Sequence, residues 1–429
     1  MHVIIIGAGT GGLCLAQGLH RAGIDVAVYE RDRGPSGGLL GYRVGIDADG
    51  KRALRANLSP ELYQTFLATC ARRGLYGNQL TKDKKFLFSA GPADLRAEDR
   101  PSEEDIDESV SRMTLRQVLL TGLDDLVRFG KEFTGYEHTE DGRVTAHFAD
   151  GTSATGDLLV GAEGANSPVR KQYLPHASTV ETGLVGISCK APLTEETRAL
   201  LPERMLRGVS MIHGDRGNMC IIHVMQFDWD IPPFDNTDYI MFGFAAAKNW
   251  LPDNVLSLRG RDALQVVLDR TTDWHPDFRR IFALGDPASC FPLSIRTSEP
   301  IPAWPTTNVT LVGDAIHTMT PGRGVGANTA LRDARLLTRT LTRAARGETS
   351  LLDAVHEYET TMTGYAWDAV IKSRAQMDGN AIIHRAGLGG AFARAGMRTA
   401  MRVMDHLPPV KRKLAAAESS FRGRDRDEA

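Results

Sequence analysis

The feature that most constrains the fold is a glycine-rich segment near the start of the chain, Gly7-Ala8-Gly9-Thr10-Gly11-Gly12. It matches the pattern G-x-G-x-x-G and follows a short apolar run at residues 3–6, which suits a buried parallel strand. A segment with helical periodicity comes next, and a second apolar run follows at residues 26–29. This order predicts a strand–helix–strand unit with parallel strands, and therefore an α/β fold.

Each element of this unit has a physical role in holding a dinucleotide. Gly7 permits the tight turn, Gly9 lets a pyrophosphate approach the backbone, and Gly12 allows the helix to pack closely on the strand. The helix N-terminus offers N–H groups and the positive end of the helix dipole to phosphates. Glu30 ends the second strand, where a carboxylate can accept hydrogen bonds from both ribose hydroxyls and repels a 2′-phosphate. The unit therefore predicts FAD or NAD rather than NADP.

A second motif begins at residue 157, where a buried strand leads into a turn of small residues that carries Glu163 and Arg170. The same residues also fit a helix N-terminus, with Ser167 as the N-cap and Pro168 at the first helical position. The sequence alone leaves open whether this turn has a functional role or only begins a helix.

A third motif follows the apolar run at residues 309–312. A strand there delivers Gly313 and Asp314 to a loop, and the Gly324-Val325-Gly326 turn then opens another helix. The Asp314 carboxylate can accept a hydrogen bond from a sugar-like hydroxyl. His317 fits a structural hydrogen-bonding role better than that of a base.

The three motifs in this order resemble the single-component FAD-dependent aromatic hydroxylases, which are flavoprotein monooxygenases with the para-hydroxybenzoate hydroxylase fold. The resemblance covers roughly residues 1–345 and implies FAD bound by the first and third motifs. It implies Glu30 at the adenosine ribose, Asp314 at the ribityl chain and the turn that ends at Asn328 beside the isoalloxazine ring. The family usually has Asp where this chain has Glu163. The predicted cofactor-binding residues are Gly7, Gly9, Gly11, Gly12, Glu30, Arg112, Arg116, Glu163, Gly313, Asp314, Pro321, Gly324, Val325, Gly326 and Asn328.

The expected architecture is a Rossmann-like FAD-binding domain with an inserted β-sheet substrate domain and C-terminal helices. The FAD-binding domain is predicted to comprise residues 1–175 and 301–345, and the β-rich substrate domain residues 176–300. Residues 71–100 are expected to contribute to the substrate domain, and residues 346–429 to be helical. Two hairpins are predicted, one joining residues 144–148 to 153–160 and the other joining 209–213 to 219–227.

The resemblance also implies the reaction. NADPH or NADH, bound transiently, would reduce FAD; dioxygen would add to the reduced flavin, and the flavin peroxide would hydroxylate an aromatic or polyketide-like small molecule. The substrate is expected between the FAD-binding domain and the inserted sheet. The catalytic candidates are His223, on an apolar strand face, and Arg43, in a loop that resembles the one lining the flavin. A core or edge histidine is the simpler interpretation of His223.

Other functions remain open at this point. Epoxidation or Baeyer–Villiger oxygen insertion would use the same scaffold. A flavin-dependent halogenase is suggested by residues 227–232, Phe-Asp-Trp-Asp-Ile-Pro, which resemble the W-x-W-x-I-P signature with Phe for the first Trp. An NAD-dependent dehydrogenase would explain the first motif but not the third, and a non-catalytic flavin-binding regulator would bind FAD without turnover.

Composition narrows the class of protein further. The chain has 51 Lys+Arg against 53 Asp+Glu, so no global basic field favours nucleic acid or an anionic membrane. No apolar run is long enough to cross a bilayer. The five cysteines are scattered without a C-x-x-C pair, which argues against a disulfide framework or a zinc ribbon and favours a reduced cytoplasm. No metal site is expected, and the oligomeric state stays open.

Overall fold

The computed structural model describes residues 1–37, 41–91, 94–95, 102, 104–379, 381–384 and 387–421, and the side chains up to residue 414. The predicted regions 71–100 and 346–429 therefore lie partly outside the described residues.

A parallel sheet forms the first half of the molecule. Five described strands make it, in the order β17-β11-β1-β2-β7. Their bounds are β1 (His2–Ile6), β2 (Asp25–Glu30), β7 (Val127–Phe129), β11 (Leu158–Gly161) and β17 (Val309–Leu311). Helix α1 (Thr10–Arg21) connects β1 to β2, as the glycine motif predicts. The α/β prediction is confirmed.

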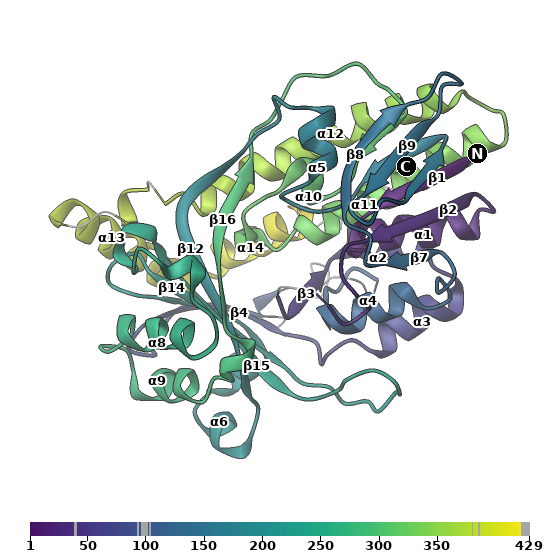
Figure 1. Cartoon of the computed structure of the whole chain (residues 1–429). Coiled ribbons are helices and arrows are strands. Elements are labelled where there is room, and N and C mark those ends of the chain that lie inside the picture. The colour runs from purple at the N-terminus through teal and green to yellow at the C-terminus, as the bar shows by residue number, and fades with distance from the viewer. Residues whose placement is uncertain are drawn as a thin grey trace.

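Helices surround the parallel sheet. Figure 1 shows α1, α11 (Gly326–Ala345) and α12 (Leu351–Gln376) beside it. Their apolar side chains, such as Leu15, Leu337 and Tyr358, join the sheet residues in one buried core. The other helices of this half are α2 (Ala48–Asn57), α3 (Pro60–Ala68), α4 (Arg112–Leu120), α5 (Pro168–Tyr173) and α10 (Asp314–His317).

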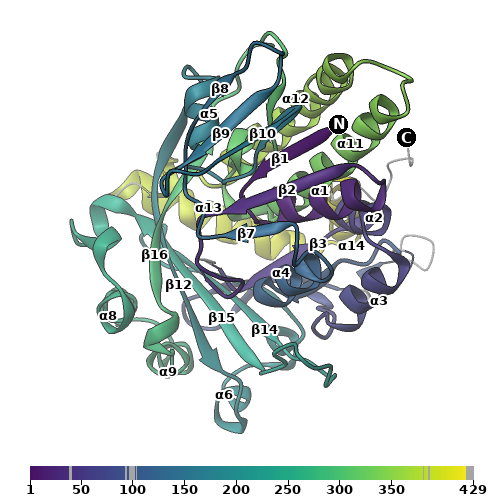
Figure 2. The same ribbon diagram turned by 45° about the vertical axis from the view of Figure 1, so that its right-hand side comes forward.

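Two small sheets lie against this half. One is antiparallel and consists of β8 (Phe133–His138), β9 (Val144–Phe148) and β10 (Ser153–Gly156), and Figure 2 shows β10 next to β1. The other pairs β3 (Arg43–Ile46) with β6 (Glu108–Ser111). The prediction of one strand over residues 153–160 was wrong, because the chain changes sheet at Asp157. Its backbone N–H donates to His2 O (2.8 Å), and its carboxylate accepts the His2 N–H (2.6 Å).

A large mixed sheet forms the second half (Figure 1). Among the described strands its order is β16-β12-β15-β14-β13-β4-β5. The bounds are β4 (Tyr76–Thr81), β5 (Phe86–Ala90), β12 (Thr179–Pro192), β13 (Gly208–His213), β14 (Met219–Met225), β15 (Tyr239–Ala247) and β16 (Phe291–Ser298). The predicted β13–β14 hairpin is present, although β14 ends two residues before Phe227.

The two faces of the large sheet differ. Helices α8 (Gly260–Arg270) and α9 (Pro276–Ala283) cover the outer face, where Phe242, Phe244 and Phe282 are fully buried. The opposite, inner face turns towards the parallel-sheet half, because Tyr239 and Met225 pack there against Tyr42. Two short helices, α6 (Glu195–Ala199) and α7 (Glu203–Leu206), precede β13.

The C-terminal segment returns to the edge of the large sheet through α13 (Leu388–Asp405) and α14 (Pro408–Phe421). The Asp405 carboxylate accepts the backbone N–H of Ser89 on β5 (3.0 Å), and Arg398 pairs with Asp215 (2.9 Å). The domain boundaries drawn from the sequence stay predictions. None of the described helices combines the length and the apolar character that a membrane crossing requires.

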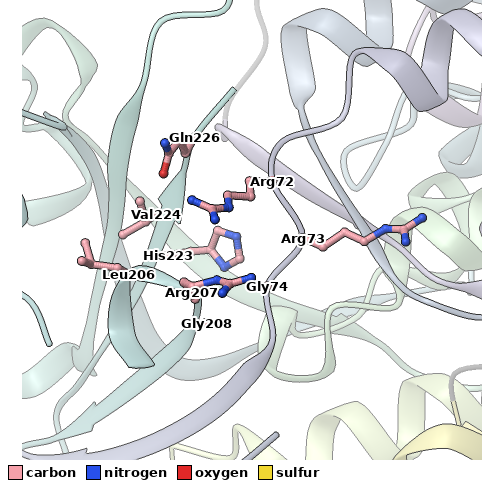
Figure 3. A pocket seen from close by; sticks show the side chains of 9 residues that line it. All are labelled: Arg72, Arg73, Gly74, Leu206, Arg207, Gly208, His223, Val224 and Gln226. Carbon is pink, nitrogen blue, oxygen red and sulfur yellow. The ribbon is translucent and has the colours of Figure 1, made fainter. Parts of the chain in front are cut away.

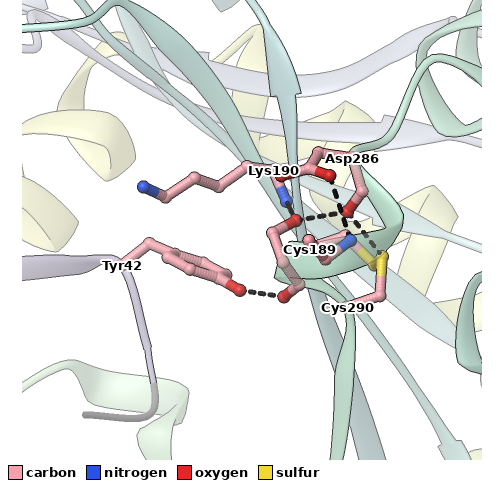
Figure 4. Close-up of a disulfide and its surroundings, with 7 residues drawn as sticks. Tyr42, Cys189, Lys190, Asp286 and Cys290 are labelled. Carbon is pink, nitrogen blue, oxygen red and sulfur yellow. Dashed lines mark hydrogen bonds between the residues drawn. A yellow bond between two sulfur atoms is a disulfide. The ribbon is translucent and has the colours of Figure 1, made fainter. Parts of the chain in front are cut away.

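One disulfide joins Cys189 to Cys290 in the described part of the chain (Figure 4). The two residues are 101 positions apart in the sequence, and adjacent strands bring them together. The scattered spacing of the cysteines argued against a disulfide framework and did not indicate this pair. The remaining described cysteines, Cys14, Cys70 and Cys220, are free and buried.

Candidate functional site

The three sequence motifs meet at one edge of the parallel sheet. Strands β1, β11 and β17 are parallel, so the turns that follow them emerge at the same edge. Gly7 has φ of 105°, and a Cβ there would lie 2.6 Å from the backbone oxygen of Ala162 in the second motif. A Cβ on Gly11 would lie 3.3 Å from the Ala330 Cβ, and one on Gly313 would lie 2.9 Å from it. The first motif therefore contacts both of the others.

The first motif leaves the beginning of α1 open to a ligand. Gly9 is the N-cap of α1 and provides no side-chain cap for the N–H groups of the first turn. A Cβ on Gly12 would lie 2.3 Å from Gly7 O, so only glycine permits this close approach of helix and strand. Glu30 is 8% exposed, and its carboxylate accepts the backbone N–H groups of Ala8 (2.6 Å) and Asp32 (2.9 Å). These bonds fix the carboxylate beside the open turn and leave it further lone pairs.

Two arginines of α4 supply unsatisfied donors. Arg116 Nη1 donates to Gly37 O (2.8 Å) and to Asp32 (3.2 Å). Its Nε and Nη2, and the Nε of Arg112, are buried without a hydrogen-bond partner in the described part of the chain. Burial lowers the pKa of Arg112, Asp314 opposes that decrease, and Arg116 adds to it. Buried guanidinium donors without acceptors are costly, so this arrangement fits an acceptor-rich ligand such as a phosphate or flavin.

Asp314 is the first residue of α10 and lies close to the start of α11. Its side chain is exposed to solvent, yet the surrounding protein desolvates it enough to raise its pKa. His317 and Arg112 oppose that increase, and Asp333 adds to it. The carboxylate is thus accessible to solvent, although protein atoms surround it. A Cβ on Gly326 would lie 4.0 Å from Asp314 Oδ1, which places the carboxylate beside the start of α11.

Asp333, on α11, fixes the turn that carries Asp314. Its Oδ2 accepts the Gly313 N–H (2.8 Å) and pairs with His317 Nε2 (2.6 Å), and its Oδ1 accepts the Tyr365 hydroxyl (2.6 Å). Burial disfavours protonation of His317, but the interactions with Asp333 and Asp314 raise its pKa overall. His317 therefore has the structural role that the sequence favoured. Asp333 was not among the residues predicted from the sequence, because its contacts with Gly313 and His317 are tertiary and no local pattern encodes them.

Asn328 joins the third motif to the β3 segment. Its Oδ1 accepts the Asp47 N–H (3.1 Å), and its Nδ2 donates to Gly45 O (2.9 Å). A Cβ on Gly50 would lie 2.2 Å from Asn328 Oδ1, so Gly50 permits the contact. Asn328 thereby connects the first turn of α11 to the β3 segment.

The rest of this loop is built for a sharp reversal. Gly324 follows the short helix Pro321–Arg323 and has φ of 66°, the left-handed region that glycine favours. Val325 then acts as the N-cap of α11 without a side-chain cap, as Gly9 does for α1. Two uncapped helix N-termini therefore lie at the same edge of the sheet.

Glu163 organises the second motif from within. Its Oε2 accepts the Ser167 hydroxyl (2.8 Å) and its Oε1 the Val169 N–H (3.1 Å). Ser167 is the N-cap of α5, and Arg170 Nη1 donates to Ala315 O (2.9 Å). The helix N-cap interpretation is thus the observed one, and the turn braces α10. Burial raises the pKa of Glu163 to about 7, against the hydrogen bonds that lower it.

His223 lies on β14, at the inner face of the large sheet, and Arg43 lies on β3. His223 is 2% exposed, and burial, with a smaller effect of Arg43, lowers its pKa well below the ordinary value. Its Nδ1 has no hydrogen-bond partner among the described residues. Arg43 Nε donates to Ser109 Oγ (3.0 Å) on the paired strand β6.

The imidazole of His223 borders a cavity of about 10 Å³. Figure 3 shows it beside Arg72, Arg207 and Gln226, whereas Arg73 points away towards Glu108, with which it pairs (2.7 Å). The volume suits about one water molecule. This setting matches the core-histidine interpretation, and the catalytic roles of His223 and Arg43, like the cofactor contacts above, stay predictions.

Comparison with known proteins gives a consistent result. A family model described as an FAD binding domain matches residues 298–373, and one for an NAD(P)-binding Rossmann-like domain matches residues 5–73. The chain is 34% identical over 375 residues to the dual O-methyltransferase/FAD-dependent monooxygenase elcB of Phaeosphaeria nodorum, covering 77% of this chain and 39% of that protein. It is 29% identical to the FAD-dependent urate hydroxylase of Klebsiella pneumoniae, covering 88% and 90%. The chain thus spans about two fifths of the length of elcB.

A solved structure also matches most of the chain. It is that of a FAD-containing monooxygenase from Photorhabdus luminescens, with 34% sequence identity and a TM-score of 0.79. The match covers 90% of this chain and all of that one. The resemblance found in the sequence is confirmed, and the chain belongs to the family of FAD-dependent monooxygenases.

Proposed function

We propose that this chain is an NAD(P)H-using, FAD-dependent monooxygenase that hydroxylates an aromatic or polyketide-like small molecule. The observation that carries the proposal is the convergence of three turns, two uncapped helix N-termini and the Asp314 carboxylate at one edge of the parallel sheet. The family to which the chain belongs supplies the chemistry that this arrangement would support.

The residues that would hold FAD follow from their donors and acceptors. The first turn of α1 and Arg116 would bind the pyrophosphate, because both present N–H donors. Glu30 would accept the ribose hydroxyls, and Asp314 a ribityl hydroxyl. The N-terminus of α11 would stabilise negative charge on the ring system. Bound FAD would accept two electrons from the nicotinamide and would supply the reactivity towards dioxygen.

The inner face of the large sheet would bind the substrate. Lys190, Met241 and His223 lie in register across three strands of this face. Tyr239 and Met225 extend it, with Tyr42, Phe227 and Trp229 packed nearby. Polarisable and aromatic side chains suit a flat ring, and they exclude water from the site. Urate, named for one relative, is such a flat ring.

The test is oxygen incorporation by the FAD-loaded protein. Candidate aromatic compounds are screened for faster NAD(P)H consumption, and the product is analysed after reaction under isotopically labelled dioxygen. One labelled oxygen atom in the product is expected. NAD⁺ reduction that needs no dioxygen would instead indicate a dehydrogenase, and a brominated product with added bromide would indicate the halogenase alternative.

A further inference from the structure

Lys190 occupies a distinctive position at the junction of the two halves. It lies on β12, and its Nζ is 4.4 Å from the centre of the Tyr239 ring and 4.8 Å from that of Tyr42. Figure 4 shows the Lys190 side chain extended above the Tyr42 ring. Tyr239 belongs to the large sheet, whereas Tyr42 directly precedes β3, so the ammonium lies between a sheet residue and a loop residue of the other half.

Among the residues that the structure describes, no side chain of opposite charge pairs with Lys190. Within the described residues it forms no ion pair, and its side chain forms no hydrogen bond, so its contacts are the two ring faces. Burial lowers its pKa, while the more distant Asp235 and Asp286 partly offset that decrease. Cation–π contacts attract the ammonium to the ring faces but do not neutralise its charge. The half-buried ammonium thus keeps the capacity to bind an anion.

The two rings are held in place by hydrogen bonds. The Tyr239 hydroxyl donates to Tyr42 O (3.0 Å), and the Tyr42 hydroxyl donates to Ser289 O. The backbone of Lys190 donates to Ser289 Oγ (2.8 Å), beside the Cys189–Cys290 disulfide (Figure 4). Lys190 is therefore presented by a fixed frame and not by a free surface loop.

The frame adjoins the predicted flavin site. Tyr42 O also accepts the backbone N–H of Arg112 (2.9 Å), the arginine whose charge interacts with Asp314. In the opposite direction, Lys190 is in register with Met241 on the inner face, next to the apolar cluster of Met225 and Phe227. A substrate on this face would meet one cation in otherwise aromatic and apolar surroundings.

We propose that Lys190 is a specificity-determining residue, which selects aromatic substrates that carry an anionic oxygen, either a carboxylate or an ionised phenol or enol. This inference rests on the proposed function. The Tyr42 and Tyr239 rings orient the ammonium, and the anionic oxygen completes its coordination. A neutral analogue would leave the ammonium without a counter-charge. The site would therefore bind the anionic compound much more tightly than the neutral one.

The experiment measures ligand binding to the FAD-loaded protein through the change in flavin absorbance. The probes are aromatic acids paired with their neutral amides, for example 4-hydroxybenzoate and 4-hydroxybenzamide. The binding of acidic phenols that lack a carboxylate is measured at pH values below and above the pKa of each phenol. These measurements show whether an ionised phenol binds as a carboxylate does. Lys190→Met removes the charge and keeps the chain length, Lys190→Arg keeps the charge, and Lys248→Met is the control. Lys248 is exposed and pairs with Glu181 at the edge of the same sheet (3.3 Å).

We expect the wild type to prefer the anionic member of at least one pair by about 10-fold or more, the size of a charge-assisted hydrogen bond. Lys190→Met abolishes the preference by weakening the anion alone, whereas Lys190→Arg and Lys248→Met retain it. The proposal is overturned if the wild type shows no such preference, if Lys190→Met preserves it, or if Lys190→Met weakens acid and amide equally, as a purely structural clamp would. Binding is measured without turnover, so a charge preference without oxygen incorporation would refute the proposed function alone.

Discussion

Asp333 determines the geometry of the candidate site from a fully buried position. It holds Gly313, His317 and Tyr365 with three separate hydrogen bonds, and so sets the direction in which the neighbouring Asp314 points. Asp314 itself is free to accept a ligand hydroxyl because the turn is fixed by a different carboxylate. At the scale of single residues, the group proposed to bind the cofactor, Asp314, is therefore distinct from the group that positions it, Asp333.

The role of Asp314 can be tested by Asp314→Asn, which keeps the shape and removes the charged acceptor. We expect the FAD dissociation constant to rise by about 10- to 100-fold, since a hydrogen bond to a charged group contributes roughly 1.5–3 kcal/mol. Flavin fluorescence titration of the stripped protein measures this. Asp368→Asn, at an exposed position of α12, is the matched control, and equal affinities in the two variants would contradict the assignment.

The raised pKa of Glu163 predicts that its contribution to stability depends on pH. Its pKa rises from an ordinary value of 4.5 to about 7 in the folded chain, so the folded state holds the proton more tightly than the unfolded state. The contribution of Glu163 to the free energy of unfolding is therefore present at low pH and is lost as pH rises from about 4.5 to about 7. Glu163→Gln lacks this dependence. The melting temperature of the wild type minus that of Glu163→Gln should fall between pH 5 and pH 8.

Thermal melts across this pH range provide the check, with Glu203→Gln at an exposed position of α7 as the control. A difference in melting temperature that stays constant, or increases with pH, would show that the carboxyl is not held protonated by burial.

At the scale of elements, the contact between α1 and β1 depends on glycine. In Gly12→Ala the new Cβ would lie 2.3 Å from Gly7 O, a backbone atom that cannot move without opening the turn. We expect a loss of about 1–3 kcal/mol in unfolding free energy, as for other overpacked positions, together with loss of FAD. Denaturant unfolding and flavin content measure the two effects.

Gly364→Ala is the matched control for this substitution. Gly364 is exposed within α12 and has open space around it, so the change should stabilise the helix by about 0.5–1 kcal/mol. If Gly12→Ala were as stable as Gly364→Ala, the close approach of helix and strand would be refuted.

Elements that depend on local sequence could be predicted, whereas those that depend on distant pairing could not. The strand–helix–strand unit and the β13–β14 hairpin follow from local periodicity and glycine placement, and both were predicted correctly. The division of residues 153–160 into β10 and β11 was not, because it depends on pairing with β1 from far away in the chain. The contact of Asp333 with Gly313 and the stacking of Lys190 between two tyrosines are likewise tertiary, and no local pattern encodes them.

At the scale of the whole molecule, the proposed cofactor site requires the start of the chain to lie next to α11, which is far away in the sequence. Gly11 and Ala330 nearly touch, and Asn328 bonds to the segment at Asp47. The resemblance predicted this convergence, whereas the residues alone predicted only separate turns. The large sheet contacts this half through the hydrogen bond from the Tyr239 hydroxyl to Tyr42 O.

The most direct test is therefore FAD binding by the full chain. The purified protein is stripped of bound flavin, mixed with FAD and passed through a gel-filtration column while protein and flavin absorbance are recorded. We predict that about one FAD per chain co-elutes with the folded protein, and that Asp314→Asn retains less. Folded protein that elutes without flavin, at FAD concentrations that saturate other members of the family, would contradict the account.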